Sequence, residues 1–493
     1  MRWRDTRVWA IAGLILVIAA CSVSDAELSA PELRADLATS ARATTTPEEP
    51  ALAERPSKLE SETADDDAKQ PPPPAETSKP AAPSVSSADQ SSLPPEATRT
   101  PVPHISASST PSNSPSSDSN ENAETSDSNV NSMFGPISCR ENEENVELTE
   151  FIYDLDRFDI LVPMGRMWDS HVTPTDHMYL FSVEGQQPGL VKTPAAGRLI
   201  SVGRFPRDQS PFWDTSLTAP DLRVVIAHSC TLFSIYIHVG NLIPEIAAVV
   251  GDIEPGGNWY VDPNSPIELN AGDPFAEFAG SSFDYSLHDD TVTLAGFQIP
   301  EHYSGESWKV HTVDPFDYWS DEVVAAYLAK NVRQVEPYGG KIDYDVEGTL
   351  AGNWFMDGTV DYGGGSGTDR SRYWNGHLAI AYDHVDPTQI RFSIGRDIWI
   401  SEECRACGGV YAVMDNSPDP ASVTAADGIV VYELTGRTRL TQDDAERSVS
   451  DGVLLGSFIT QVIDNETIRV EFVRGTSADS LQGFSDAAVL YRR

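Results

Sequence analysis

The stretch Leu222-Arg-Val-Val-Ile-Ala-His228-Ser-Cys-Thr-Leu-Phe-Ser-Ile-Tyr-Ile-His238 decides the fold of this chain. Two apolar runs rich in β-branched and aromatic residues stand on either side of a short polar break at His228-Ser-Cys230. Runs of this length and composition, bounded by turn-forming residues, are typical of β-strands. The segment therefore predicts strands in a β-rich domain.

The same pattern continues through residues 134–493, where Gly, Pro, Asp and Asn interrupt short apolar alternations about every ten residues. This length suits two domains, which we place at 134–300 and 301–493. We expect an all-β fold of two antiparallel β domains, the first a sandwich or barrel and the second a small barrel or sandwich, with one helix within residues 320–335. Further strand-like runs lie at 190–203, 267–287, 342–355, 377–395, 428–434 and, as a hairpin around Asp464-Asn-Glu466, 454–463 and 467–473.

Residues 22–133 contain no Phe, Tyr or Trp and are dominated by Pro, Ser, Thr, Ala and Glu. A segment without aromatic residues and with this polarity cannot build a core. We expect it to be a disordered, partly extended tether.

The N-terminus has Arg2, Arg4 and Arg7 before an apolar run that ends at Ala19-Ala20-Cys21. This is the pattern of a secretory signal with a lipobox, and the run is too short to span a bilayer comfortably. We expect residues 1–21 to direct export and Cys21 to carry a lipid that anchors the chain to a membrane, with the folded part outside the cytoplasm. The alternative is an ordinary cleaved signal peptide.

Four other cysteines remain, an even number in a compartment that permits disulfides. We expect a bridge between Cys139 and Cys230. Cys404-Arg-Ala-Cys407 is interpreted as a local disulfide, with a redox pair or half of a zinc site as alternatives.

The formal net charge is −41 at pH 7. Nucleic-acid binding needs basic stripes, so this charge excludes nucleic acid as a partner and disfavours docking on anionic lipid. We interpret the excess of acid as a solubilising surface.

The first domain contains a series of features: His171-Val-Thr-Pro-Thr-Asp-His177, then Val191-Lys-Thr-Pro-Ala-Ala-Gly197, then Tyr236-Ile-His238, then Ala271-Gly-Asp273, and finally Ser282-Phe-Asp284. This series resembles the lysostaphin-type (LytM-like) zinc endopeptidases of bacterial cell walls. The family pattern runs from a His-x-x-x-Asp segment through a Tyr-x-His strand to a final His-x-His. The resemblance covers about residues 160–289.

The resemblance implies a metal site that activates water for amide hydrolysis. Asp176 matches the aspartate ligand and His238 the mid-domain catalytic histidine. Either His171 or His177 is expected to supply the histidine ligand, although neither has the family spacing. The closing His-x-His is replaced by Ser282-Phe-Asp284, so one proton-handling histidine is lost and a carboxylate replaces a ligand.

A site with one histidine and two aspartates binds zinc or a harder divalent metal such as magnesium, calcium or manganese. Each histidine taken alone is also compatible with a structural hydrogen bond. The cofactor expected from this site is therefore zinc or another divalent metal, or none.

The second domain is rich in aromatic residues, including Gly352-Asn-Trp354 and Tyr373-Trp374. It resembles calycin-like barrels in a general way, and Trp354, Tyr373 and Trp374 either line a sugar or lipid pocket or form the barrel core and rim. His377 and His384 near Asp383 and Asp386 indicate a polar turn, with a metal site as the alternative.

These features lead to one main hypothesis and two rivals. The main hypothesis is a membrane-tethered lipoprotein whose degenerate peptidase-like domain binds or regulates peptidoglycan or another envelope glycan without cleaving it. The rivals are an active metallo-hydrolase with a variant metal site and a carrier of a small apolar ligand in the C-terminal barrel.

Overall fold

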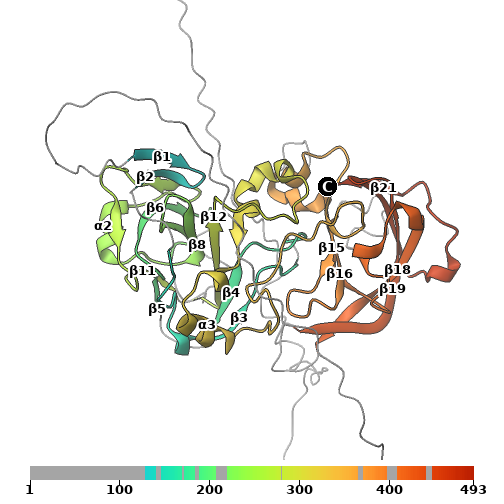
Figure 1. Ribbon diagram of the computed structural model, residues 1–493, viewed down its shortest axis with the longest axis horizontal. Helices are drawn as coiled ribbons and strands as arrows, with labels where there is room; N and C mark the ends of the chain where they lie inside the picture. The colour runs from blue at the N-terminus through green and yellow to red at the C-terminus, as the bar shows by residue number, and fades with distance from the viewer. Residues whose placement is uncertain are drawn as a thin grey trace, which may run out of the picture. The chain divides into compact units, whose positions relative to one another are not determined.

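The computed structural model describes residues 128–139, 146–168, 171–183, 188–206, 219–278, 280–364, 370–396, 408–439 and 447–493. These residues belong to one compact unit. The signal segment with Cys21, the tether up to residue 127, Cys404 and Cys407 lie outside the described residues. The predicted all-β class is confirmed, because the described elements are mainly strands arranged in sheets and a closed antiparallel barrel (Figure 1).

The first described element is an antiparallel hairpin of β1 (Ser128–Ser132) and β2 (Gly135–Cys139). Gly135 has a φ of 135°, which favours glycine at this turn. Residues 128–132, inside the range expected to be tether, thus form a strand, because backbone pairing in a hairpin does not require apolar side chains.

A nine-stranded sheet follows, with β7 and β8 near its centre. The two apolar runs of residues 222–238 form β7 (Leu222–Ala227) and β8 (Leu232–Val239), which pair antiparallel as two neighbouring strands. The strand order is β10-β6-β7-β8-β12-β4-β3, with β9 paired to β6 and β13 to β12. The remaining strands are β3 (Phe158–Val162), β4 (Met178–Ser182), β6 (Gly197–Arg204), β9 (Asn258–Tyr260), β10 (Ile267–Leu269), β12 (Ser282–Asp289) and β13 (Thr312–Val313).

Both faces of this sheet are covered. All six residues of β7 are buried, which explains why its sequence is apolar almost throughout instead of alternating with polar residues. One face packs in a large core with Val224, Tyr236 and Tyr285. The other face packs in a smaller core with Val225 and Phe233.

The chain beyond Pro300 adds to the same sheet before it enters the barrel. The 3-10 segment η2 (Pro300–His311) leads into β13, which pairs with β12. The helix α3 (Asp321–Leu328) follows the short 3-10 turn η3 (Pro315–Asp317), and Tyr327 from α3 lies in the larger core. The helix predicted within residues 320–335 is therefore present but shorter.

Smaller elements complete this part of the fold. The helix α2 (Pro244–Val250) was not expected, and β5 (Gly189–Lys192) pairs with β11 (Pro274–Phe278) as a separate two-stranded sheet. Within the described residues, no helix combines the length and the apolar character needed to cross a membrane.

The C-terminal strands close into an eight-stranded antiparallel barrel, in which each strand pairs with the next along the chain. The predicted hairpin around residues 464–466 joins two of these strands, β19 and β20. The strands are β14 (Gly352–Met356), β15 (His377–Tyr382), β16 (Ile390–Ile394), β17 (Gly409–Val413), β18 (Ile429–Arg439), β19 (Ser448–Val462), β20 (Thr467–Arg474) and β21 (Val489–Arg492).

A packed apolar cluster fills the barrel, with Trp354, Phe392, Tyr432 and Phe458 among its members. The guanidinium of Arg493 lies 4.0 Å from the ring centroid of Trp354 and donates to backbone carbonyls of Val346 and Thr349. This cation–π contact and these hydrogen bonds fix the end of the chain against the first barrel strand.

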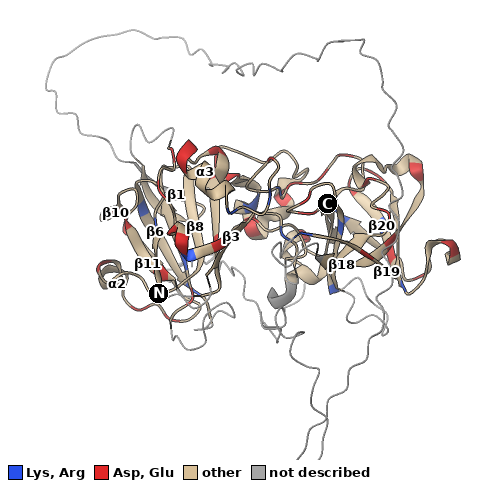
Figure 2. Cartoon of the chain, turned by 90° about the horizontal axis from the view of Figure 1, so that it is seen from below, with Lys and Arg blue, Asp and Glu red and all other residues tan. Residues whose placement is uncertain are grey.

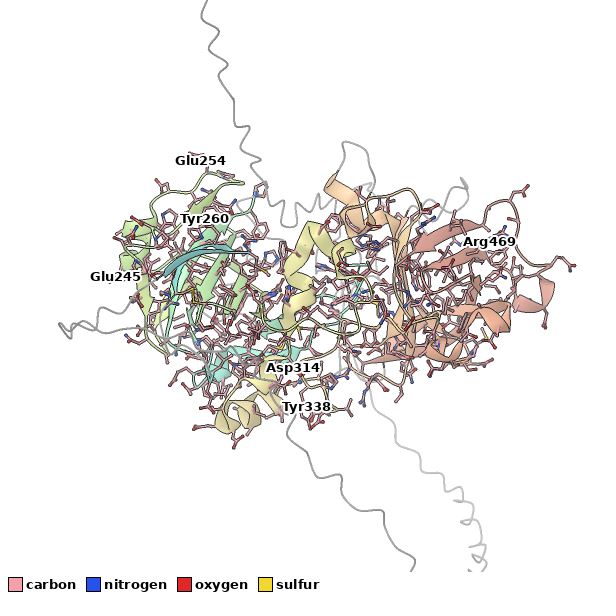
Figure 3. All side chains as sticks on the ribbon, turned by 45° about the horizontal axis from the view of Figure 1, so that its top comes forward. Glu245, Glu254, Tyr260, Asp314, Tyr338 and Arg469 are labelled. Atoms are coloured by element: carbon pink, nitrogen blue, oxygen red, sulfur yellow. A yellow bond between two sulfur atoms is a disulfide. The ribbon has the colours of Figure 1, made fainter. Side chains whose placement is uncertain are left out.

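Acidic side chains are spread over the described elements, and Lys and Arg are fewer (Figure 2). Figure 3 labels Glu245 on α2, Glu254 just after it, and the exposed Tyr260 of β9. Asp314 and Tyr338, also labelled, come from segments that are tied together because the Asp314 carboxylate accepts backbone hydrogen bonds from Phe316 and Gly339.

Candidate functional site

Five ionisable side chains gather where β4, β8 and β12 lie side by side. Asp176 and His177 immediately precede β4, Asp284 lies on β12, and His238 lies near the end of β8 with Asp221 just before β7. Asp284 pairs with Tyr179 on one side and Ile237 on the other, so the register brings these segments together. We call this group the His–Asp cluster.

His177 lies between two carboxylates. Its Nδ1 is 3.1 Å from Asp176 Oδ1, and its Nε2 is 3.2 Å from Asp284 Oδ2. The second contact is not a hydrogen bond, since the buried Nε2 has no hydrogen-bond partner. The other oxygen of Asp176 accepts a hydrogen bond of 3.1 Å from Trp308 Nε1. The ring of His177 therefore separates the two aspartates that the sequence placed in one site.

His238 reaches the cluster through an unusual backbone conformation. Its φ is 65°, a value that non-glycine residues rarely adopt and that costs roughly 1–2 kcal/mol. Its Nδ1 is 3.1 and 3.2 Å from the two Asp221 oxygens, and its Nε2 is 3.8 Å from Asp284 Oδ2. The ring also stacks on Phe205. The strained backbone thus holds this imidazole beside Asp284.

Burial and neighbouring charges shift the pKa values of Asp176, His177 and Asp284 in different ways. Burial alone would raise the pKa of Asp176, but the charge of Lys309 and the hydrogen bond from His177 lower that pKa well below its usual value. Burial disfavours the charged form of His177, yet the carboxylates of Asp284 and Asp176 outweigh it and raise the His177 pKa. For Asp284, burial dominates and raises the pKa.

His171 lies next to the cluster without joining it. Its ring centroid is 5.3 Å from that of His177, and its backbone pairs with that of Trp168. Burial, reinforced by the positive charges of His177 and Lys309, lowers the His171 pKa to about 3. His171 is therefore a neutral neighbour of His177 in the described structure.

The zinc ligand set of the lysostaphin family does not fit this arrangement. That set requires the counterparts of Asp176 and Asp284 to face one metal, whereas both oxygens of Asp176 are engaged by His177 and Trp308. Among the described residues, no group of three or more His, Cys, Asp or Glu side chains converges to hold a metal ion. Ser282, in the place of the lost catalytic histidine, is buried on β12.

A pocket lies beside the cluster, with a volume of about 40 Å³. It is lined by His171, Asp176 and His177 together with groups that the sequence did not single out. Those groups include Arg223, Ser286, Glu306, Trp308 and Lys309. Tyr373, which the sequence predicts as a pocket candidate of the barrel, lines this pocket as well. Trp308 and Lys309 were missed because they lie beyond Pro300, in the stretch assigned to the other domain.

The aromatic candidates of the barrel divide into two groups. Trp354 is fully buried in the barrel core and donates its indole N–H to the carbonyl of Leu350. Tyr373 instead lines the pocket and donates a hydrogen bond of 2.9 Å to Glu306. Trp374 is buried. Only Tyr373 of these three therefore lines the described pocket.

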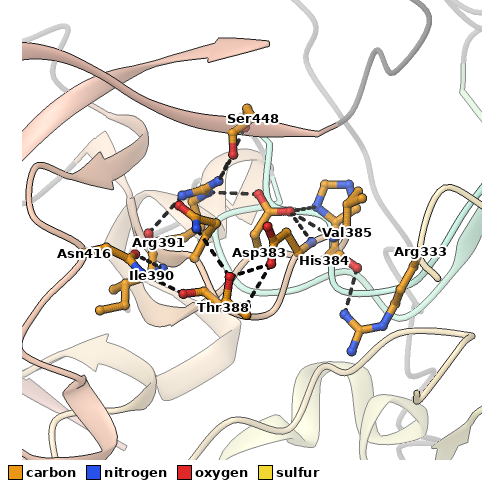
Figure 4. A network of polar contacts seen from close by, with 11 residues as sticks. Arg333, Asp383, His384, Val385, Thr388, Ile390, Arg391, Asn416 and Ser448 are labelled. Atoms are coloured by element: carbon orange, nitrogen blue, oxygen red, sulfur yellow. Dashed lines mark hydrogen bonds and ion pairs between the residues drawn. The ribbon is translucent and has the colours of Figure 1, made fainter. Parts of the chain in front are cut away.

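The histidines near Asp383 do not form a common site with Asp386 in the described residues. Asp383 accepts backbone hydrogen bonds from Val385 and Asp386 and pairs with Arg391 (Figure 4). His377 instead contacts the carbonyl of Tyr362. The arrangement is the polar turn that the sequence indicated.

The predicted Cys139–Cys230 bridge is present and links the end of β2 to the turn after β7. His228 lies at the start of that turn, and its two ring nitrogens contact Ser234 and the carbonyl of Ala196. These contacts give His228 a structural role beside the bridge.

No protein-family model matches the chain, and no curated protein matches it significantly. Among solved structures, it is similar to a zinc-containing peptidase from Vibrio cholerae, with 11% sequence identity and a TM-score of 0.18. The match covers 32% of this chain and 45% of that chain, less than half of the peptidase's length. The lysostaphin-type resemblance therefore stays a prediction.

Proposed function

We propose that this chain is a membrane-tethered, extracytoplasmic lipoprotein that binds peptidoglycan or a related envelope glycan or peptide without cleaving it. The proposed lipid is on Cys21, and residues 22–133 give the folded part its reach. Binding without peptide-bond cleavage is the part of the proposal that the site geometry supports.

One observation carries this proposal: His177 lies between the carboxylates of Asp176 and Asp284. A metal-dependent peptidase needs ligands that face a common centre and a separate group that handles protons. Here the two aspartates face opposite sides of one imidazole, and Ser282 stands where the family has a catalytic histidine.

The neighbouring pocket supports binding. It combines the flat rings of Trp308, Tyr362 and Tyr373 with the charged side chains of Glu306 and Lys309. Aromatic faces stack on the apolar faces of sugars, and a few polar groups then fix the orientation of a ligand. A glycan or a short peptide attached to one has this mixed chemistry.

The test is sedimentation of the purified full chain with insoluble peptidoglycan, followed by chromatography of the supernatant. We expect the protein in the pellet and no soluble wall fragments. Removing a stacking ring with Trp308→Ala should weaken binding by roughly threefold to tenfold, the equivalent of one aromatic contact. Tyr260→Ala is the matched control, because this exposed ring on β9 does not line the pocket.

Two results would contradict the proposal. A full chain that stays in the supernatant shows that it does not bind peptidoglycan. Soluble fragments that appear with the full chain and disappear with His177→Ala show that the site cleaves the wall.

A variant metallo-hydrolase is the second candidate, favoured by the buried Nε2 of His177 that lacks a hydrogen-bond partner. Asp284 Oδ2, 3.2 Å from this nitrogen, would be the second ligand, and Asp176 holds the opposite nitrogen of His177. The described residues bring no third His, Cys, Asp or Glu ligand to the same point. Metal analysis of the full chain tests it: one equivalent that is lost in Asp284→Ala supports this candidate, and no bound metal refutes it.

The apolar-carrier alternative receives less support. The closed barrel is occupied by its own side chains, including the buried rings of Trp354, Phe392, Tyr432 and Phe458. Co-purification of a lipid that is lost in Trp354→Ala would revive it.

A further inference from the structure

A serine and a histidine on β12 form a hydrogen-bonded pair at the wall of the pocket. Ser286 and His288 are two positions apart on the strand, so their side chains project from the same face. The Ser286 hydroxyl lies 2.8 Å from His288 Nε2, and Ser286 lines the pocket. Ser286 therefore borders the space in which a ligand would lie, whereas the fully buried His288 contacts that serine without lining the pocket.

The contacts of His288 fix its tautomer. Its Nδ1 is 3.2 Å from the carbonyl oxygen of Trp308, which can only accept a hydrogen bond. Thr312 Oγ1 is also 3.2 Å from Nδ1, so a proton on Nδ1 has two acceptors, and in this tautomer Nε2 accepts a hydrogen bond from the Ser286 hydroxyl. A nucleophile, a base and an acceptor that orients the base occur in this order in enzymes that transfer acyl groups.

A second pair shows what distinguishes this one. Ser234 Oγ is 2.7 Å from His228 Nε2, and His228 Nδ1 is 3.1 Å from the carbonyl of Ala196. The contacts are nearly the same, but Ser234 is fully buried, also contacts the Tyr285 hydroxyl, and does not line the described pocket. Of these two serine–histidine pairs, only Ser286–His288 has its serine at the wall of the described pocket.

We propose that Ser286 is a nucleophile, that His288 is its general base, and that this chain hydrolyses small acyl esters of carbohydrate hydroxyl groups. This activity goes beyond the proposed binding function and does not depend on it. It also leaves peptide bonds intact, in agreement with that function.

The pocket sets the substrate class. Its volume of about 40 Å³ accommodates roughly three water molecules, which is the size of an acetyl group. The rings of Trp308, Tyr362 and Tyr373 provide stacking surfaces for the sugar that carries the ester. Lys309 also lines the pocket; its ammonium group donates a hydrogen bond of 2.7 Å to the carbonyl of Pro174 and adds positive charge near the reacting carbonyl.

The reaction balances with water as the only co-reactant. Ser286 Oγ attacks the ester carbonyl as His288 Nε2 takes the hydroxyl proton, and a bond forms between Oγ and the acyl carbon. The bond from that carbon to the sugar oxygen breaks, and the sugar hydroxyl leaves with the proton from His288. Water, deprotonated by His288, then attacks the acyl-serine and releases the acid, returning the proton to Ser286.

The test is reaction of the purified full chain with a fluorophosphonate probe, followed by peptide mass spectrometry. We expect one phosphonyl adduct, on Ser286, and none on Ser234. This localisation uses the unchanged chain, so it does not depend on the folding of a variant. The absence of an adduct, or an adduct on another residue alone, overturns the proposal.

Turnover of p-nitrophenyl acetate provides the second measurement. Ser286→Ala should abolish turnover above the buffer rate, and His288→Gln should reduce kcat by about 100-fold or more, the usual contribution of a general base. Ser234→Ala is the matched control and should retain turnover, because this serine does not line the pocket. Turnover that survives in Ser286→Ala overturns the proposal.

Discussion

The His–Asp cluster and a second buried cluster at the barrel differ in how their charges are compensated. The barrel cluster consists of Arg333, Asp383, His384, Arg391 and Ser448 (Figure 4). In it, Arg391 Nε is 2.9 Å from Asp383 Oδ2, its terminal nitrogens donate to the carbonyls of Ile390 and Ser448, and Arg333 donates to the carbonyl of His384. The His–Asp cluster instead places three carboxylates, those of Asp176, Asp221 and Asp284, around the two imidazoles of His177 and His238.

The difference shows which buried charges serve the fold. Removing either partner of a buried, hydrogen-bonded ion pair destabilises the protein, because the other charge stays buried without compensation. A buried cluster with more carboxylates than imidazoles costs stability, and such sites persist where a ligand or a reaction uses them. We therefore expect the barrel cluster to stabilise the fold and the His–Asp cluster to serve the proposed function. Four measurements test this distinction.

Lowering the pH should have the largest effect on folding stability. The groups responsible should lie outside the barrel cluster. Burial lowers the pKa of His228 and His288 to about 4 and that of His377 to about 3. Below about 6.5 the unfolded chain binds protons that the folded chain does not, so stability falls as the pH falls from 6.5 toward 4. We expect a loss of about 2 kcal/mol for each of these histidines between pH 7 and pH 5. Asp290, Asp314 and Asp345, whose pKa burial raises to about 6, bind protons more readily in the folded chain and offset part of this loss.

Urea unfolding at the two pH values measures this loss. The barrel cluster should not contribute, because burial of Asp383 is outweighed by the charges of His384 and Arg391, which lower its pKa, and arginine does not titrate. Stability that is unchanged between pH 7 and pH 5 would contradict the prediction.

Asp383→Asn should destabilise the protein by about 3–5 kcal/mol, because it leaves the charge of Arg391 buried and unpaired. Asp357→Asn is the matched control: Asp357 pairs with Arg492 at 2.7 Å, but both side chains are exposed, so the expected cost is below about 1 kcal/mol. Urea midpoints of both variants decide the comparison. Similar midpoints would show that the barrel cluster does not stabilise the fold.

Trp308→Phe should cost about 2 kcal/mol, since it removes the hydrogen bond from the indole nitrogen to the ionised Asp176 while keeping an aromatic ring. Thermal unfolding at pH 7 measures the cost. A midpoint equal to that of the unchanged chain would show that Asp176 does not depend on this bond.

Asp284→Asn should have the smallest effect, below about 1 kcal/mol in either direction. Burial raises the pKa of Asp284, so removal of this charge relieves a desolvation cost as it removes the contact with His177. Asp176→Asn provides the contrast within the same cluster, because surrounding charges lower the pKa of Asp176 and its ionised form stabilises the fold. If Asp284→Asn is as costly as Asp383→Asn, the distinction between the clusters fails.

Much of the fold was predictable from local patterns. The apolar runs of residues 222–238 became β7 and β8, and the turn around residues 464–466 became the hairpin of β19 and β20. The Cys139–Cys230 bridge followed from pairing an even number of cysteines. These features depend on side-chain periodicity and chain composition, which are visible in a single sequence.

The sequence predicted that the candidate residues lie near one another, but it did not predict which side chains contact each other. Asp176, His177, His238 and Asp284 do lie close together. Their pairing was not foreseen, because it depends on the register of β12 with β4 and β8 and on a positive φ at His238.

Other partners come from distant parts of the chain. Asp221 precedes a different strand, and Trp308 and Lys309 belong to a segment that the sequence assigned to the next domain. A strand pattern does not reveal which remote side chain completes a hydrogen bond.

The Cys139–Cys230 bond has a mechanical consequence under the proposed anchoring at Cys21. Any tension that the envelope exerts on the folded part enters through its N-terminal end, at β1 and β2. Hydrogen bonds of a two-stranded hairpin separate one after another under such a pull. The covalent link passes the load directly from the end of β2 to the turn that joins β7 and β8 at the centre of the sheet. Under that anchoring, a pull that separates β1 from β2 would reach the sheet at a covalent bond and not at a row of hydrogen bonds.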